Sequence, residues 1–137
     1  MKYWLLFVPF LVMGASVETT DAGKVLYEQN CVSCHGLEGK GDGLRAARLN
    51  TPPPDLTKIA ARRDGVWPML EVMAILDGYS RNTLPREDMP VFENFLDNEM
   101  SEFDTGNGVV TLVPTKLLDI VYYLETLQDP APTSYVP

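Results

Sequence analysis

Histidine and cysteine are almost absent from this chain of 137 residues, which contains one histidine and two cysteines. A zinc site built on several histidines therefore cannot form within one chain, and neither can a haem held by two histidines. The longest apolar run falls short of the ~20 residues that a membrane-spanning helix needs. Net positive charge is also lacking: the formal charge is −8, which argues against a general nucleic-acid binder, since that function needs a basic face.

The remaining composition is that of an ordinary folded protein. Hydrophobic residues make up 45% and charged residues 22% of the chain, a balance typical of globular domains. The length allows one domain, since domains commonly have about 100–150 residues. No internal repeat or low-complexity block is present.

The two ends of the chain differ from its middle. Lys2 is followed by an apolar run that Pro9 interrupts, and then by small residues at 14–16, the layout of a secretory signal peptide. We therefore predict a signal peptide at 1–20, a folded domain at 21–129, and a flexible proline-rich tail at 130–137. An uncleaved N-terminal anchor is the alternative for the first segment. With cleavage, we expect a periplasmic protein with no stable membrane insertion.

Both cysteines and the histidine lie in one pentapeptide, Cys31-Val32-Ser33-Cys34-His35. C-x-x-C-H is the attachment signature of c-type haem. Two thiols three positions apart can add to the two vinyl groups of one porphyrin, and the next residue is then held under the iron as its proximal ligand. The motif predicts one haem c, bound covalently through Cys31 and Cys34, with His35 on the iron.

Three other readings of the pentapeptide compete with haem. A disulfide between the cysteines leaves His35 unexplained. A thioredoxin-like redox pair needs a preceding strand and a βαβ context, whereas residues 22–30 look helical. A zinc site needs a fourth ligand, which this composition does not supply.

The flanking residues extend the match, and the chain resembles bacterial class I c-type cytochromes. The resemblance covers nearly all of the predicted domain. Its features, in order, are Gly23 and Tyr27 on an entry helix, the C-x-x-C-H motif, a Gly-rich loop, Pro52-Pro53-Pro54-Asp55, Met89-Pro90-Val91-Phe92, and a closing helix with Tyr123-Leu124. C-x-x-C-H and M-P-x-F in this order, about fifty residues apart, are more specific together than either is alone.

In a His/Met-ligated haem the second iron ligand would be one of the six methionines. Met69 and Met73 have helical spacing and are expected to fill the core, and Met100 lies in an acidic stretch. Met89 lies in a loop that prolines stiffen on both sides, and the resemblance points to the same residue. We therefore predict Met89 as the sixth ligand. The alternative is a five-coordinate haem that binds small gases.

The resemblance implies two further contacts. A backbone carbonyl within 51–54 would hold the second ring nitrogen of His35, as ligating imidazoles usually require. The first and last helices would cross where Gly23 permits a close approach, with Tyr123 as its partner.

The predicted fold class is all-α, a cytochrome c fold of small helices and long loops around one haem. Helices are expected near 22–30, with Asp21 as N-cap, and near 57–63, 66–77 and 115–128. Between 93 and 113 the chain is longer than a minimal connection, and Asn107-Gly108 followed by a β-branched run predicts a short hairpin.

Charge is unevenly distributed along the chain. Residues 40–63 contain six Lys or Arg and two acids, whereas residues 87–104 contain seven acids and no base. We expect redox partner proteins, an oxidase or a dehydrogenase, to dock through a basic patch that meets the acidic segment. Two solvated faces without a partner are an equally good reading. The basic residues of the first half are also candidates to neutralise haem propionates.

These observations predict an exported monohaem electron carrier rather than an enzyme. The iron would cycle between Fe(III) and Fe(II) while both ligands stay bound. Two alternatives remain: a haem subunit bound within an exported oxidoreductase complex, and a gas-binding or peroxidatic haem protein.

Overall fold

The computed structural model describes residues 17–79, 88–104, 106 and 108–136. The predicted signal segment therefore lies outside the described residues, apart from 17–20. Among the described residues, no helix has the length and apolar character needed to cross a membrane.

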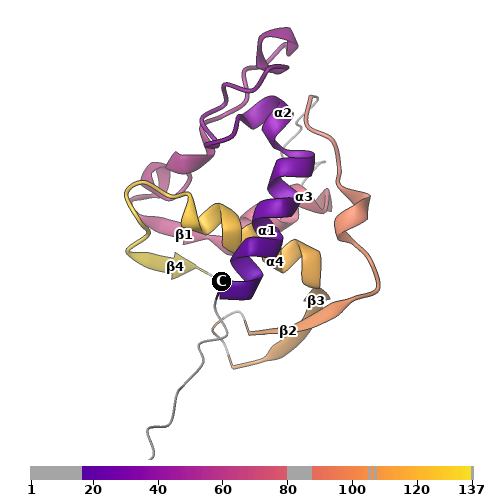
Figure 1. Ribbon diagram of the computed structural model, residues 1–137. Coiled ribbons are helices and arrows are strands. Elements are labelled where there is room, and N and C mark those ends of the chain that lie inside the picture. Colours follow the sequence, from indigo (N-terminus) through magenta and orange to yellow (C-terminus); the bar gives the residue numbers. More distant parts are fainter. Residues whose placement is uncertain (1–16, 80–87, 105, 107, 137) are drawn as a thin grey trace, which may run out of the picture.

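Two helices cross at the centre of the molecule (Figure 1). They are α1, Val17–Asn30, and α4, Thr115–Thr126. A Cβ built on Gly23 would lie 2.1 Å from the backbone oxygen of Asp119 and 2.7 Å from Cβ of Tyr123. Only glycine allows this approach, and the predicted crossing of Gly23 with Tyr123 is confirmed.

The first helix begins earlier than expected. It starts at Val17, so Asp21 lies inside α1 and is not its N-cap. Tyr27 on this helix is fully buried, and its ring centroid is 5.4 Å from that of Tyr123. The apolar stripe of α4 buries Ile120 and Val121 completely, so the helix crossing forms the core.

Smaller elements surround this pair. In chain order they are α2 Val32–His35, the 3-10 turns η1 Ala46–Arg48, η2 Leu56–Lys58 and η3 Ala61–Arg63, strand β1 Val66–Pro68, α3 Met69–Leu76, η5 Glu93–Phe95, strands β2 Met100–Asp104 and β3 Val110–Pro114, and β4 Ser134–Val136. The predicted helix at 57–63 is thus two 3-10 turns, and the one at 66–77 begins with a strand. Pro68 explains the later start of α3, because proline suits the beginning of a helix and not its interior.

The structure contains two short sheets among the described residues, of which the sequence predicted one. The hairpin expected between 93 and 113 exists: β2 pairs antiparallel with β3, Met100 opposite Pro114 and Asp104 opposite Val110. The tail differs from its prediction as a frayed segment, because β4 pairs in parallel with β1. Figure 1 shows the hairpin at the lower end of the molecule and α2 at the upper end.

Candidate functional site

A cavity of about 1030 Å³ opens beside α2. Its walls come from α2 with the end of α1, from Arg45 and the proline-bearing segment 49–54, and from residues 88–92. All four residues predicted from the sequence line it: Cys31, Cys34, His35 and Met89. The volume lies at the upper end of that of small-molecule sites, so the space suits a large cofactor.

The cysteines are placed by the helical turn that follows α1. The backbone N–H groups of Cys34 and His35 donate to the oxygen of Cys31, at 3.1 and 2.8 Å. Residues three apart on a helix share a face, so both thiols face the cavity. Both are free cysteines; Cys31 is buried and Cys34 half-buried. Burial, followed by the charge of Cys34, raises the pKa of the Cys31 thiol to about 12.

The Gly-rich loop after His35 folds back along α2. N–H groups of Gly41 and Gly43 donate to the oxygens of His35 and Cys34, at 2.8 and 3.1 Å. These bonds satisfy carbonyls that a helix end leaves without partners. At Gly41, φ is +80°, and a Cβ there would lie 2.3 Å from the oxygen of Pro53. The loop therefore packs the proline segment against the helix that carries the motif.

His35 is buried, with 8% of its surface exposed. Its Nδ1 lies 3.3 Å from the backbone oxygen of Pro54. The prediction of a carbonyl within 51–54 is confirmed, and the structure selects Pro54. Because a carbonyl only accepts, Nδ1 carries the proton, and the lone pair resides on Nε2.

Met89 is half-buried and packs against the core. Among the described methionines it alone lines the cavity, and it also lines a smaller adjoining one of about 90 Å³. Met69 and Met73 are buried core residues, as expected, and Met100 is 45% exposed on β2. The carboxylate of Asp88 accepts a hydrogen bond from the N–H of Thr51 at 3.2 Å, which links the two rims of the cavity. Pro85, expected to stiffen this loop, lies outside the described residues.

A comparison with protein families identifies the fold. The family model for cytochrome c matches residues 20–128. The chain belongs to the cytochrome c family. No curated protein and no solved structure matches it significantly. The match and the short helices of the structure confirm the expected cytochrome c fold. Cytochrome c domains carry covalently attached haem c and transfer electrons rather than act as classical enzymes.

Basic side chains of the cytochrome lie at both cavities. Arg45 lines the larger one, and Arg62 and Arg63 line the smaller. Arg63 forms an ion pair with Glu71, and Nη1 of Arg62 donates to the backbone oxygen of Asp55 at 3.0 Å. The expectation that basic residues of the first half face the cofactor therefore remains a prediction for these three.

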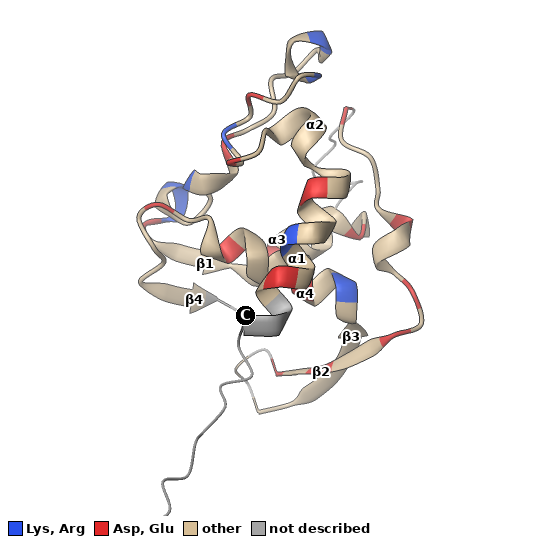
Figure 2. Ribbon diagram, in the orientation of Figure 1, with Lys and Arg blue, Asp and Glu red and all other residues tan. Residues whose placement is uncertain are grey.

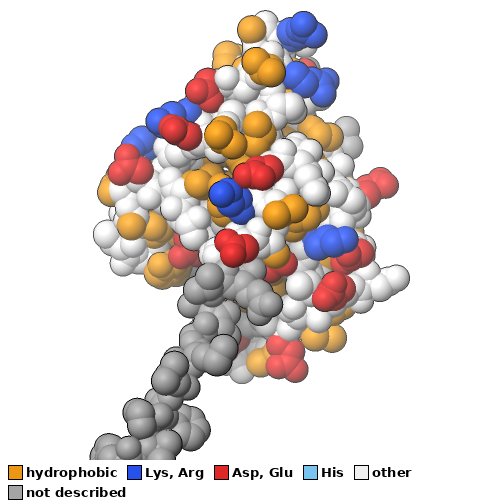
Figure 3. Space-filling view, in the orientation of Figure 1, with side chains coloured by type: hydrophobic (Ala, Val, Ile, Leu, Met, Phe, Trp, Pro, Cys, Tyr) orange, Lys and Arg blue, Asp and Glu red, His pale blue; other side chains and the backbone are white. Residues whose placement is uncertain are grey.

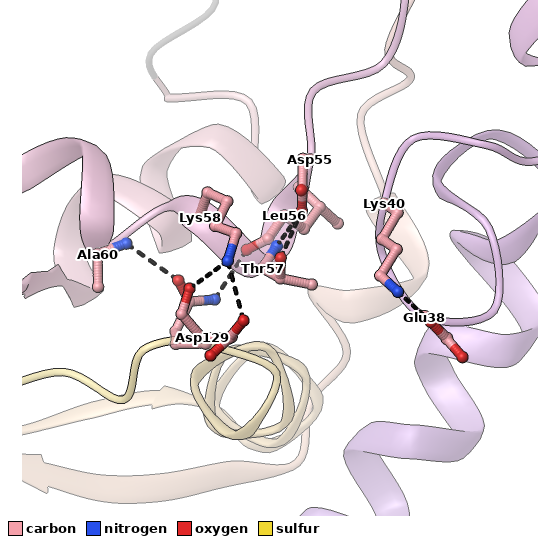
Figure 4. A network of polar contacts seen from close by, with 9 residues as sticks. Glu38, Lys40, Asp55, Leu56, Thr57, Lys58, Ala60 and Asp129 are labelled. Atoms are coloured by element: carbon pink, nitrogen blue, oxygen red, sulfur yellow. Dashed lines mark hydrogen bonds and ion pairs between the residues drawn. The ribbon is translucent and has the colours of Figure 1, made fainter.

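One group of contacts was not singled out by the sequence. Figure 4 shows the end of α4 joined to residues 55–60 by a network of polar contacts. Nζ of Lys58 donates to the backbone oxygen of Asp129 at 2.7 Å, and N–H of Asp129 donates to the oxygen of Thr57 at 2.9 Å. Gln128 is the buried member, with 7% of its surface exposed. A glutamine that follows a helix carries no motif, so no sequence signal could have marked it.

Proposed function

We propose that this protein is an exported monohaem c-type cytochrome, of the bacterial class I type, that carries single electrons between redox partners. The observation that carries the proposal is the cavity that Cys31, Cys34, His35 and Met89 line together. These four come from segments more than fifty residues apart, and their donor set is that of a His/Met-ligated haem c. One C-x-x-C-H motif in the whole sequence supports a count of one haem.

The residues that line the cavity have the chemistry that haem c requires. Bound haem supplies a one-electron Fe(III)/Fe(II) couple. Cys31 and Cys34 would hold its macrocycle through thioethers, and Met89, which lines the same cavity, would supply its sulfur to the iron. His35, fixed by the carbonyl of Pro54, would present Nε2. A carbonyl on Nδ1–H raises the basicity of the imidazole, so this contact also tunes the couple.

The ligand set is tested by the Fe(III) spectrum of the haem-loaded protein. Methionine ligation to Fe(III) gives a weak absorption band near the red end of the visible spectrum, and we expect Met89→Ala to abolish this band. Met100→Ala is the matched control, because Met100 lies on β2 outside the cavity. A band that survives in Met89→Ala, or that is lost in Met100→Ala, would overturn the assignment.

A haem subunit held within an exported oxidoreductase complex is the second candidate. The hairpin favours it, because Val110 and Leu112 on β3 are 58% and 60% exposed and both flank the acidic strand β2. Exposed apolar surface of this kind marks interaction sites. Co-elution with the native partner in size-exclusion chromatography would support the subunit, and separate elution the free carrier.

We propose that redox partners, an oxidase or a dehydrogenase, meet the acidic segment 88–104 with a basic patch. Figure 2 shows acidic residues along this segment, at the right, and basic residues on segment 40–63, at the top and left. In the space-filling view basic side chains gather at the upper tip (Figure 3). Because salt screens such attraction, the association rate with the partner should fall as ionic strength rises. A rate that is insensitive to salt would exclude this docking mode.

A further inference from the structure

The side chain of Gln128 makes three hydrogen bonds, all to backbone groups. Its Nε2 donates to the oxygens of Leu56 and Leu124, both at 2.8 Å, and its Oε1 accepts from the N–H of Ala60 at 3.0 Å. Ala60 is fully buried. One buried side chain therefore joins the end of α4 to the main chain of residues 56–60.

These bonds act close to the acceptor of His35. Both backbone groups of Leu56 are hydrogen-bonded. Its N–H donates to the oxygen of Gly39 at 2.7 Å, and its oxygen accepts from Nε2 of Gln128. Pro54, two residues earlier, accepts from Nδ1 of His35. Between them lies Asp55, whose carboxylate accepts from the N–H and the hydroxyl of Thr57 at 2.8 and 2.6 Å. These bonds restrict the short stretch that joins the carbonyl of Pro54 to the peptide that Gln128 holds.

The neighbouring contacts cannot replace Gln128. The ion pair of Lys58 with Asp129 is solvent-exposed, with 40% and 83% of the two side chains accessible, and exposed pairs contribute little. A buried donor or acceptor that loses its partner is costly. Residues 56–60 are therefore held by the backbone bonds of Gly39 and Asp129 and by the buried amide of Gln128.

We infer that Gln128 is a positioning residue for the axial imidazole, because it holds the segment whose Pro54 carbonyl orients His35. The inference rests on the proposed function, in which His35 ligates the iron. Gln128 itself touches neither the cavity nor the ligands; it acts through the main chain.

The test compares haem-loaded Gln128→Met with haem-loaded Val121→Ala. Methionine has the length of glutamine and makes none of its hydrogen bonds. Val121→Ala weakens the buried core on α4, the helix that precedes Gln128, and removes no hydrogen bond, so it is a control for loss of global stability. The readouts are the solvent-exchange rate of the His35 Nδ1 proton, measured by NMR in the Fe(II) state, and the reduction potential.

We expect the Nδ1 proton to exchange about tenfold faster in Gln128→Met than in the control, because the three bonds of the Gln128 side chain are lost and local opening of residues 54–60 becomes easier. The potential should shift in Gln128→Met and stay at the wild-type value in Val121→Ala. If Gln128→Met fails to retain haem, Gln128→Glu takes its place. Glutamate keeps an oxygen that accepts from the N–H of Ala60, and it loses the bonds donated to Leu56 and Leu124.

Two failures are distinguishable. If the wild-type spectrum shows no imidazole ligation, the proposed function and this inference both fail. If wild type has His35 on the iron and Gln128→Met matches Val121→Ala in both readouts, only the positioning role is overturned.

Discussion

The close approach of α1 and α4 at Gly23 gives the sharpest stability prediction. A Cβ at this position would lie 2.1 Å from the backbone oxygen of Asp119, whereas ordinary contact begins near 3.4 Å. The helices must therefore separate by about 1.3 Å in Gly23→Ala. Backbone lies on the other side of the clash, so no side-chain rotamer relieves it.

The magnitude follows from two opposing effects. Overpacking of a core costs ~1–3 kcal/mol, and a backbone clash belongs at the upper end. Alanine regains ~1 kcal/mol because it favours helix over glycine. The net loss is then about 2 kcal/mol, which lowers the melting temperature by roughly 8 °C in a domain of this size.

The assay is thermal unfolding of the haem-loaded protein, followed by circular dichroism. Lys24→Ala is the matched control, because Lys24 is the exposed neighbour on the same helix and its loss should change the free energy of unfolding by less than ~0.5 kcal/mol. If Gly23→Ala were as stable as wild type, the helix crossing would not be tightly packed at this point.

Two further contacts near the site have measurable effects. The buried hydroxyl of Tyr27 donates to the oxygen of Gly36 at 2.6 Å, so Tyr27→Phe should cost ~1–3 kcal/mol in chemical denaturation; unchanged stability would contradict a role for this bond. Burial raises the pKa of Tyr27, so this cost should not vary between pH 5 and 8. The carboxylate of Asp55 accepts from the hydroxyl and N–H of Thr57, at 2.6 and 2.8 Å, and the hydroxyl bond chiefly lowers the pKa of Asp55. Asp55→Ala should cost ~1 kcal/mol as a lost cap. Because the folded pKa lies below the ordinary value of about 4, this contribution is complete above that value and is lost as pH falls through the folded pKa. A difference between wild type and Asp55→Ala that stays constant from pH 6 to pH 2 would refute this assignment.

The sequence alone predicts the residue types of the site more fully than it predicts the contacts around them. One histidine and two cysteines in a single pentapeptide predict the attachment of one haem, because local spacing on a helical turn sets both thiols on one face. Hydrophobic periodicity located α4, since a helix buried on one side must repeat its apolar residues. The crossing partner of Gly23 came instead from the resemblance to known cytochromes.

Local patterns failed where distant segments compete. Residues 57–63 form 3-10 turns because Gln128 and Asp129 take their backbone groups. Residues 134–136 form a strand because β1 offers a free edge, and Val17 rather than the capping residue Asp21 begins α1. The 3-10 turns and the strand depend on partners far away in sequence, which no local propensity encodes.

The sequence by itself thus predicts which residues would bring sulfur and imidazole to a haem, because covalent attachment depends on residue type and short spacing. Only the tertiary structure decided that the carbonyl of Pro54 faces His35 and that Gln128 braces the segment carrying it. Backbone carbonyls are the same in every residue, so their roles arise from packing and cannot be read from residue type.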